Sequence, residues 1–80
     1  MNIDIKTFVE KFASQFEESQ LELFSPTTIF RELDEWDSMI ALMIIAMVDE
    51  EYKVKLSGDE IKGSVTIQDI FDKVIAKANG

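Results

Sequence analysis

A run of ten apolar residues at positions 39–48 is the longest hydrophobic stretch of this chain, and it constrains the fold more than any other feature. Asp37 and Ser38 precede the run, and the acids at positions 49–51 follow it. Asp and Ser ahead of an apolar run are typical of helix starts, because their side-chain oxygens accept hydrogen bonds from the free N–H groups of the first turn. The sequence therefore predicts a helix that begins near Ser38 and runs to Glu51.

This arrangement places the hydroxyl of Ser38 at a helix N-terminus. The positive end of the helix dipole and the free N–H groups there stabilise an anion, so a phosphate ester on Ser38 would lie in a favourable field. The alternative is that Asp37 and Ser38 only cap the helix, which is the usual role of such a pair. Other parts of the chain decide between these two interpretations.

The acids at the end of the run indicate which side of the expected helix faces water. At about 100° per residue, Asp49 and Glu50 project on the same side as four apolar residues. These four form the exposed stripe: Met39, Leu42, Met43 and Ala46. The opposite side should be buried and carries Ala41, Ile44, Ile45, Val48 and Tyr52. A contiguous apolar stripe beside Ser38 indicates a partner surface with an acidic rim, and the alternative is that a loop covers it.

The first part of the chain predicts one helix followed by a long loop. Apolar residues at helical spacing and a cap at Asp4 predict a helix that ends near residues 17–20. The residues of this stripe are Ile5, Phe8, Val9, Phe12, Ala13 and Phe16. Residues 21–36 show no sustained period and contain the only proline, Pro26, which predicts a connection with a short helical turn at residues 28–32. Its apolar side chains should fold back onto the helices: Leu23, Phe24, Ile29, Phe30, Leu33 and Trp36.

The last part of the chain predicts a short helix and then a longer one. Residues 52–56 alternate like a strand but have no second strand to pair with, so we expect an extended connector. Ser57 and Glu60 have the spacing of a capping box, which predicts a short helix limited by Gly63. A final helix should start near Thr66, with its apolar face on Ile67, Ile70, Phe71, Val74, Ile75 and Ala78.

These elements predict an all-α fold in a single domain over residues 1–80. We expect a small bundle of three longer helices plus one short helix, with a long loop between the first and second helices. One core should join residues from three of the helices: Phe12, Ile44, Val48, Ile70, Phe71 and Val74. A chain of 80 residues has a stability on the order of 4–12 kcal/mol.

Composition excludes several classes of function. Sixteen acidic and eight basic residues give a net charge of −8, which disfavours nucleic acid and favours partners with basic surfaces. The chain contains no Cys and no His, which removes thiolate nucleophiles, imidazole bases and most zinc sites, so any thiol would have to come from a cofactor. The acids should lie on exposed helix ends, which disfavours catalysis by paired carboxylates. Residues 49–60 have the length of a calcium-binding loop, but lysines occupy two of its ligand positions, so we expect neither catalysis nor a metal site. The apolar run is too short to span a bilayer and the first residues lack the features of a signal peptide, so we expect a cytoplasmic monomer.

The residues at positions 33–39, Leu-Asp-Glu-Trp-Asp-Ser-Met, precede a helix that ends in acids, and a Thr-Ile-Gln-Asp-Ile segment follows at positions 66–70. This combination resembles the acyl carrier proteins over nearly the whole chain. In that family, the serine of an Asp-Ser-Leu motif carries a 4'-phosphopantetheine arm. The resemblance implies that Ser38 is the attachment residue and Asp37 the motif aspartate, with Met39 where leucine is usual.

The resemblance also implies a function. The chain would hold an acyl or aminoacyl group as a thioester on the arm, in fatty acid or polyketide and other secondary-metabolite biosynthesis. Its partners would be a phosphopantetheinyl transferase and the enzymes that load and use the acyl group. The alternative from another class is an unmodified helical interaction module that binds its partners through the exposed stripe.

The helix after Ser38 departs from many fatty-acid carriers at two positions. Those carriers have acidic residues two and five places after the serine, where this chain has Ile40 and Met43. Asp49 and Glu50 retain the acids at the far end of the helix. We therefore expect apolar contacts with partners near the arm, on Met39, Leu42, Met43 and Ala46, and electrostatic steering by Asp49 and Glu50.

Overall fold

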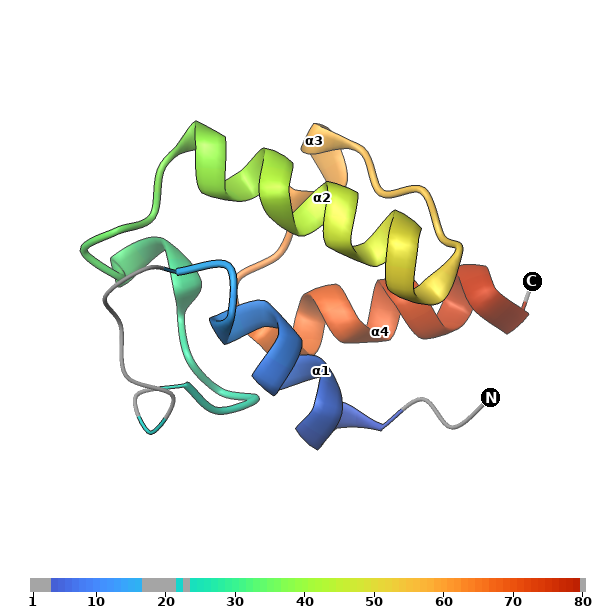
Figure 1. The fold of residues 1–80 in the computed structure, drawn as a ribbon, viewed down its shortest axis with the longest axis horizontal. Coiled ribbons are helices and arrows are strands. Elements are labelled where there is room, and N and C mark those ends of the chain that lie inside the picture. Colours follow the sequence, from blue (N-terminus) through green and yellow to red (C-terminus); the bar gives the residue numbers. More distant parts are fainter. Residues whose placement is uncertain (1–3, 17–21, 23, 80) are drawn as a thin grey trace.

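The computed structural model describes residues 4–16, 22 and 24–79 (Figure 1). Its elements are helix α1 (Ile5–Ala13), the 3-10 helix η2 (Phe30–Glu32), and helices α2 (Ser38–Tyr52), α3 (Gly58–Lys62) and α4 (Ile67–Asn79). Within these described residues there is no strand, and an isolated bridge joins Ile29 to Thr66. The predicted all-α bundle of three longer helices and one short helix is confirmed.

Helix α2 runs across the bundle above α1 and α4, and α3 lies beside it (Figure 1). Residues 24–37 of the connection between α1 and α2 occupy one end of the molecule and lead into the first turn of α2. In the part of the chain that the structure describes, no helix is long and apolar enough to cross a membrane. This arrangement leaves the start of α2 and one of its long sides at the surface.

Phe12 lies at the centre of the core and is fully buried. Its ring centroid is 5.8–6.4 Å from those of Phe8, Phe16, Phe24, Phe30 and Trp36. The plane of the Trp36 ring is parallel to that of Phe12 within 1°. All six residues expected in the core are buried, so that prediction is confirmed.

The α1–α2 connection folds onto the helices as expected. Phe24 and Phe30 are buried, and Leu33 and Trp36 pack against the core. Ile29 is the exception, because it forms the bridge to Thr66 and its side chain is 41% exposed. The expected helical turn is present as η2, and Leu23 lies outside the described residues.

Helix α1 ends at Ala13, so the prediction of an end near residues 17–20 was wrong. The amides of Gln15 and Phe16 donate to carbonyls three residues earlier, at 3.2 and 3.0 Å. Such bonds tighten the chain into a turn that ends the helix. The turn places the ring of Phe16 5.0 Å from that of Phe24, and Phe16 stays buried although it lies beyond the helix.

The expected helix starts are confirmed by their caps. The side chain of Asp4 accepts the amide of Thr7 at 2.8 Å, and the predicted capping box forms between Ser57 and Glu60. The hydrogen bond from the Ser57 amide holds the pKa of the Glu60 carboxyl below its ordinary value. Helix α2 ends where Lys53 adopts a left-handed conformation with φ of 57°, and an extended connector follows.

Candidate functional site

Ser38 is the first residue of α2, and its side chain is exposed. The preceding Asp37 is the N-cap, and its Oδ1 accepts the backbone amide of Ile40 at 2.8 Å. Within the described residues, no hydrogen bond engages the hydroxyl of Ser38. The two residues therefore have separate roles: Asp37 stabilises the helix start, and Ser38 presents an unbonded hydroxyl to solvent.

A cavity of about 490 Å³ opens beside Ser38, between α2, α3 and the end of the α1–α2 connection. We call it the Ser38 cavity. Its apolar walls are Trp36, Ala41, Leu42, Ile45 and Ile61. Two cations, Arg31 and Lys62, also line it. Its volume lies in the range of about 300–1,000 Å³ that is typical of ligand sites, and its lining suits a group with an anionic end and an aliphatic body.

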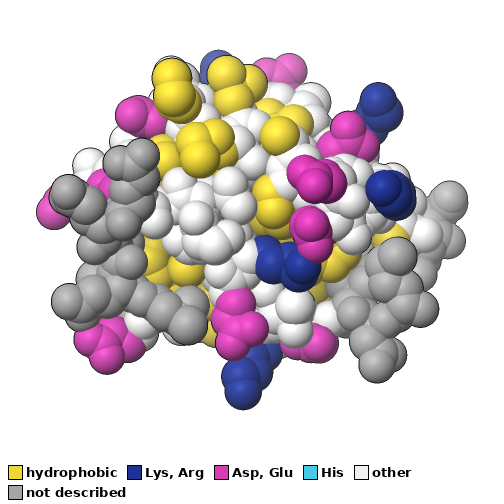
Figure 2. Space-filling model, viewed as in Figure 1, with side chains coloured by type: hydrophobic (Ala, Val, Ile, Leu, Met, Phe, Trp, Pro, Cys, Tyr) yellow, Lys and Arg dark blue, Asp and Glu magenta, His cyan; other side chains and the backbone are white. Residues whose placement is uncertain are grey.

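The exposed stripe of α2 is at the surface, as its sequence pattern predicts. Met39 is 67% exposed, Leu42 66% and Met43 37%, and Ala46 is exposed as well. Hydrophobic side chains gather along the edge that α2 forms, and acidic side chains lie toward the end of that helix (Figure 2). Asp49 and Glu50 are exposed beyond the stripe. The exposure of the stripe is confirmed, and its role in partner binding stays a prediction.

Ile40 is not a surface residue. This finding corrects the sequence-based view that Ile40 and Met43 both replace surface acids of the fatty-acid carriers. It is 9% exposed and belongs to the core. The reason is helical geometry, because Ile40 lies one turn before Ile44 and two turns before Val48, both of which are fully buried. Of the two positions where many fatty-acid carriers have acids, only Met43 lies at the surface.

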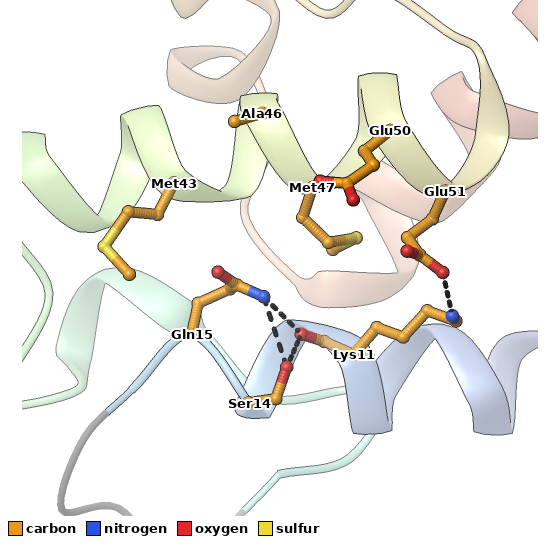
Figure 3. A pocket seen from close by; sticks show the side chains of 8 residues that line it. All are labelled: Lys11, Ser14, Gln15, Met43, Ala46, Met47, Glu50 and Glu51. Carbon is orange, nitrogen blue, oxygen red and sulfur yellow. Dashed lines mark hydrogen bonds and ion pairs between the residues drawn. The ribbon is translucent and has the colours of Figure 1, made fainter.

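A second hollow, of about 360 Å³, lies on the other side of α2, against α1 (Figure 3). Met43, Met47 and Glu50 line it from α2, and Gln15 lines it from the turn that follows α1. An ion pair between Lys11 and Glu51 joins the two helices at its far end. The exposed stripe is thus a ridge with the Ser38 cavity on the α3 side and this hollow on the α1 side.

A family model described as the phosphopantetheine attachment site matches residues 6–74, which is most of the chain. The chain belongs to this family. No curated protein and no solved structure matches it. Members of the family carry a covalently attached 4'-phosphopantetheine group and act as carriers without catalytic activity of their own.

The surroundings of Ser38 in this carrier domain fit that group. An exposed, unbonded hydroxyl at a helix N-terminus is accessible to a transferase and lies in a field that stabilises a phosphodiester. Arg31 and Lys62 add positive charge in the adjacent cavity. The apolar walls match the aliphatic part of the arm or of its load.

The sequence pattern of the carrier domain does not identify the other residues that line the Ser38 cavity. Arg31 lies in a connection without periodicity, and only tertiary packing brings it beside α3. A signal was present for Ala41, Leu42 and Ile45, since residues spaced by three and four share one side of a helix. The structure brings Leu42 of the exposed stripe and the half-buried Ala41 and Ile45 into one cavity wall.

Proposed function

We propose that this carrier domain holds an acyl or aminoacyl group on a 4'-phosphopantetheine arm attached to Ser38 and presents it to biosynthetic enzymes. The observation that carries the proposal is the exposed and unbonded hydroxyl of Ser38 at the first turn of α2, in a chain of the phosphopantetheine attachment family. When bound, the arm supplies the thiol that forms a thioester with the load, which this chain without cysteine cannot supply.

The other described serines support this assignment, because each of their hydroxyls is engaged. Ser14 donates to the carbonyl of Lys11 at 2.7 Å, and Ser25 is within 3.2 Å of two threonine hydroxyls. Ser57 accepts the amide of Glu60 in the capping box. Ser64 is fully buried and bonded to a carbonyl and to Lys73. Among the described serines, Ser38 is therefore the one whose hydroxyl is both exposed and free of hydrogen bonds.

The chain's own side chains then have distinct tasks. Asp37 maintains the helix start, so that the N-terminal N–H groups and the helix dipole act on the phosphodiester. Arg31 and Lys62 contribute positive charge beside it, and the apolar walls of the Ser38 cavity exclude water from an aliphatic load. Exclusion of water protects a thioester from hydrolysis between enzymes.

The intact mass of the protein tests this proposal. After incubation with a phosphopantetheinyl transferase and coenzyme A, the chain should gain the mass of one phosphopantetheine, and a sample without transferase should gain none. If no mass is gained with any transferase of broad specificity, the exposed stripe becomes the remaining functional feature. That result would favour an unmodified interaction module.

We further propose that partner enzymes dock on the exposed stripe, with Asp49 and Glu50 as the acidic rim. Solvent-exposed methionines adapt to different partner surfaces, and the hollows on both sides of the ridge can receive side chains. The net charge of −8 favours partners whose docking surface is basic.

Met43→Glu should weaken docking to an acyl-using partner by at least tenfold, because a charge replaces an apolar contact at the centre of the stripe. Stability should change by less than about 0.5 kcal/mol, because Met43 lies at the surface. Surface plasmon resonance and thermal unfolding measure the two effects. Val65→Glu is the matched control, since Val65 is also exposed but lies outside α2. Unfolding of Met43→Glu, or unchanged binding, would contradict the role of the stripe.

Asp49→Lys should slow association with the same partner while changing its dissociation rate little, because a rim charge acts mainly by long-range steering. The difference from wild type should shrink as salt is added, since salt screens exposed charges. Stopped-flow association rates at several ionic strengths measure this effect. Glu10→Lys on α1 makes the same charge change away from α2, and an equal slowing there would show that only net charge matters.

A further inference from the structure

Helix α3 is five residues long, from Gly58 to Lys62, and a helix of this length is not stable without support from the rest of the molecule. The capping box of Ser57 and Glu60 satisfies its N-terminus. Its C-terminal carbonyls accept local bonds from the amides of Gly63 and Ser64 and from the Ser64 hydroxyl, and they bear the negative end of the helix dipole. Two cations from other parts of the chain bind them.

Arg31 is the cation on the side of the Ser38 cavity. Its guanidinium donates from Nη1 to the carbonyl of Ser64 at 2.5 Å and from Nη2 to the carbonyl of Ile61 at 2.9 Å. Nη2 also donates to the carbonyl of Lys62. The charged group lies 5.1 Å from the ring centroid of the buried Phe30, which orients it further. One side chain of the α1–α2 connection thus binds three carbonyls at the end of α3.

Lys73 is the cation on the opposite side. It comes from α4, and its Nζ donates to the carbonyl of Glu60 and to the hydroxyl of Ser64, both at 2.8 Å. Lys73 therefore joins α3 to α4, whereas Arg31 joins α3 to the segment that leads into Ser38. Of these two cations, only Arg31 lines the Ser38 cavity.

The contacts of Arg31 bear directly on the shape of that cavity. Gly58, Ile61 and Lys62 of α3 form one wall, and residues of α2 form the opposite wall. Both walls also pack through buried side chains, but α3 contributes a single buried one, Ile61. The position of α3 therefore depends more on its hydrogen bonds, and less on buried side chains, than the position of any longer helix in the described chain does.

We propose that Arg31 is a positioning residue that holds α3 as a wall of the Ser38 cavity, and thereby controls access of solvent to what the cavity contains. Its consequence for a load rests on the proposed function, because only a carrier with an arm on Ser38 brings a load there. Its effect on α3 does not depend on that function. Arg31 is exposed and does not belong to the core, so its replacement should open α3 locally and leave the aromatic core intact.

Amide hydrogen exchange of the unmodified protein tests the proposal. In Arg31→Gln, the amides of Ile61, Gly63 and Ser64, which are bonded within and just after α3, should exchange at least about tenfold faster than in wild type. Amides of α1 and α4 should keep their rates. Arg31→Lys keeps the charge but lacks the two guanidinium nitrogens that bind the three carbonyls. Its exchange rates should therefore lie between those of wild type and those of Arg31→Gln.

Lys55→Gln is the matched control, because it removes one positive charge from an exposed side chain that lies outside α3 and does not line the Ser38 cavity. Its α3 amides should exchange as in wild type. Three results would overturn the proposal: unchanged exchange of α3 in Arg31→Gln, equal acceleration in Lys55→Gln, or acceleration of all helices by one common factor. The last result would mean that Arg31 stabilises the whole fold and does not position α3.

A loaded protein tests the consequence for access. A phosphopantetheinyl transferase joins the octanoyl-phosphopantetheine part of octanoyl-coenzyme A to the hydroxyl of Ser38 and releases adenosine 3',5'-bisphosphate. The mass of the protein confirms this loading before the measurement. Hydroxylamine should cleave the octanoyl thioester several-fold faster in Arg31→Gln than in wild type or Lys55→Gln, and equal rates would overturn control of access. A failure to load would count against the proposed function, and the exchange experiment would still decide the role of Arg31.

Discussion

A Ser38→Ala protein should gain no mass on incubation with a phosphopantetheinyl transferase and coenzyme A, whereas the wild-type chain should gain one arm. The expected effect is complete, because the substitution removes the oxygen to which the phosphate is joined. Folding should change little, since Asp37 supplies the cap of α2 and no hydrogen bond within the described residues engages the hydroxyl of Ser38. Circular dichroism should show unchanged helicity, and intact mass spectrometry measures the loss of attachment.

Ser57→Ala is the matched control for this result. Its hydroxyl caps α3, so its loss costs about 1 kcal/mol of stability but should leave the mass gain intact. A Ser38→Ala protein that still gained the arm would contradict the assignment. Peptide mapping of the modified chain would then identify the residue that carries it.

A Phe12→Ala protein should lose about 3–5 kcal/mol of stability, toward the upper end of that range. Phe12 is fully buried, and its ring lies near five other aromatic rings that come from α1 and from the connection to α2. The substitution leaves a cavity among these rings, and we expect no single neighbouring side chain to fill it. This loss is a large share of the stability on the order of 4–12 kcal/mol that a chain of this length has.

Urea unfolding followed by circular dichroism measures this loss. Phe71→Ala should cost less than Phe12→Ala, because Phe71 is slightly exposed and its ring contacts only that of Phe8, at 5.3 Å, among the described rings. Val65→Ala, at an exposed site, should shift the midpoint little. Equal midpoints for Phe12→Ala and wild type would show that Phe12 is not the centre of the core.

Sequence alone determined the helices and most of their starts, because the interactions that start a helix are local. The caps at Asp4, Asp37 and Ser57 each bond an amide three residues later, and such spacing is visible in the sequence. The exposed stripe was predictable for a similar reason, since one helical projection and two acids define the side that faces water.

The candidate site was predictable in its centre and not in its surroundings. Ser38 and Asp37 stood out because a short motif lies at the start of an apolar helix. The burial of Ile40 was not evident from the sequence. The helix is apolar on every side, so its sequence does not show how wide its buried face is. Neighbouring helices decided that Ile40 is core and Met43 is surface.

Only the tertiary structure decided how α1 ends and how α3 is held. Ring packing of Phe16 against Phe24 accompanies the early turn after Ala13, although the helical pattern continues beyond it. The bonds from Arg31 reach residues 30 to 33 positions away in the sequence. Contacts at that separation depend on how the loop and helices pack together, and no local pattern of residue types encodes them. The sequence therefore determined where each helix starts, and packing decided which side chains surround Ser38.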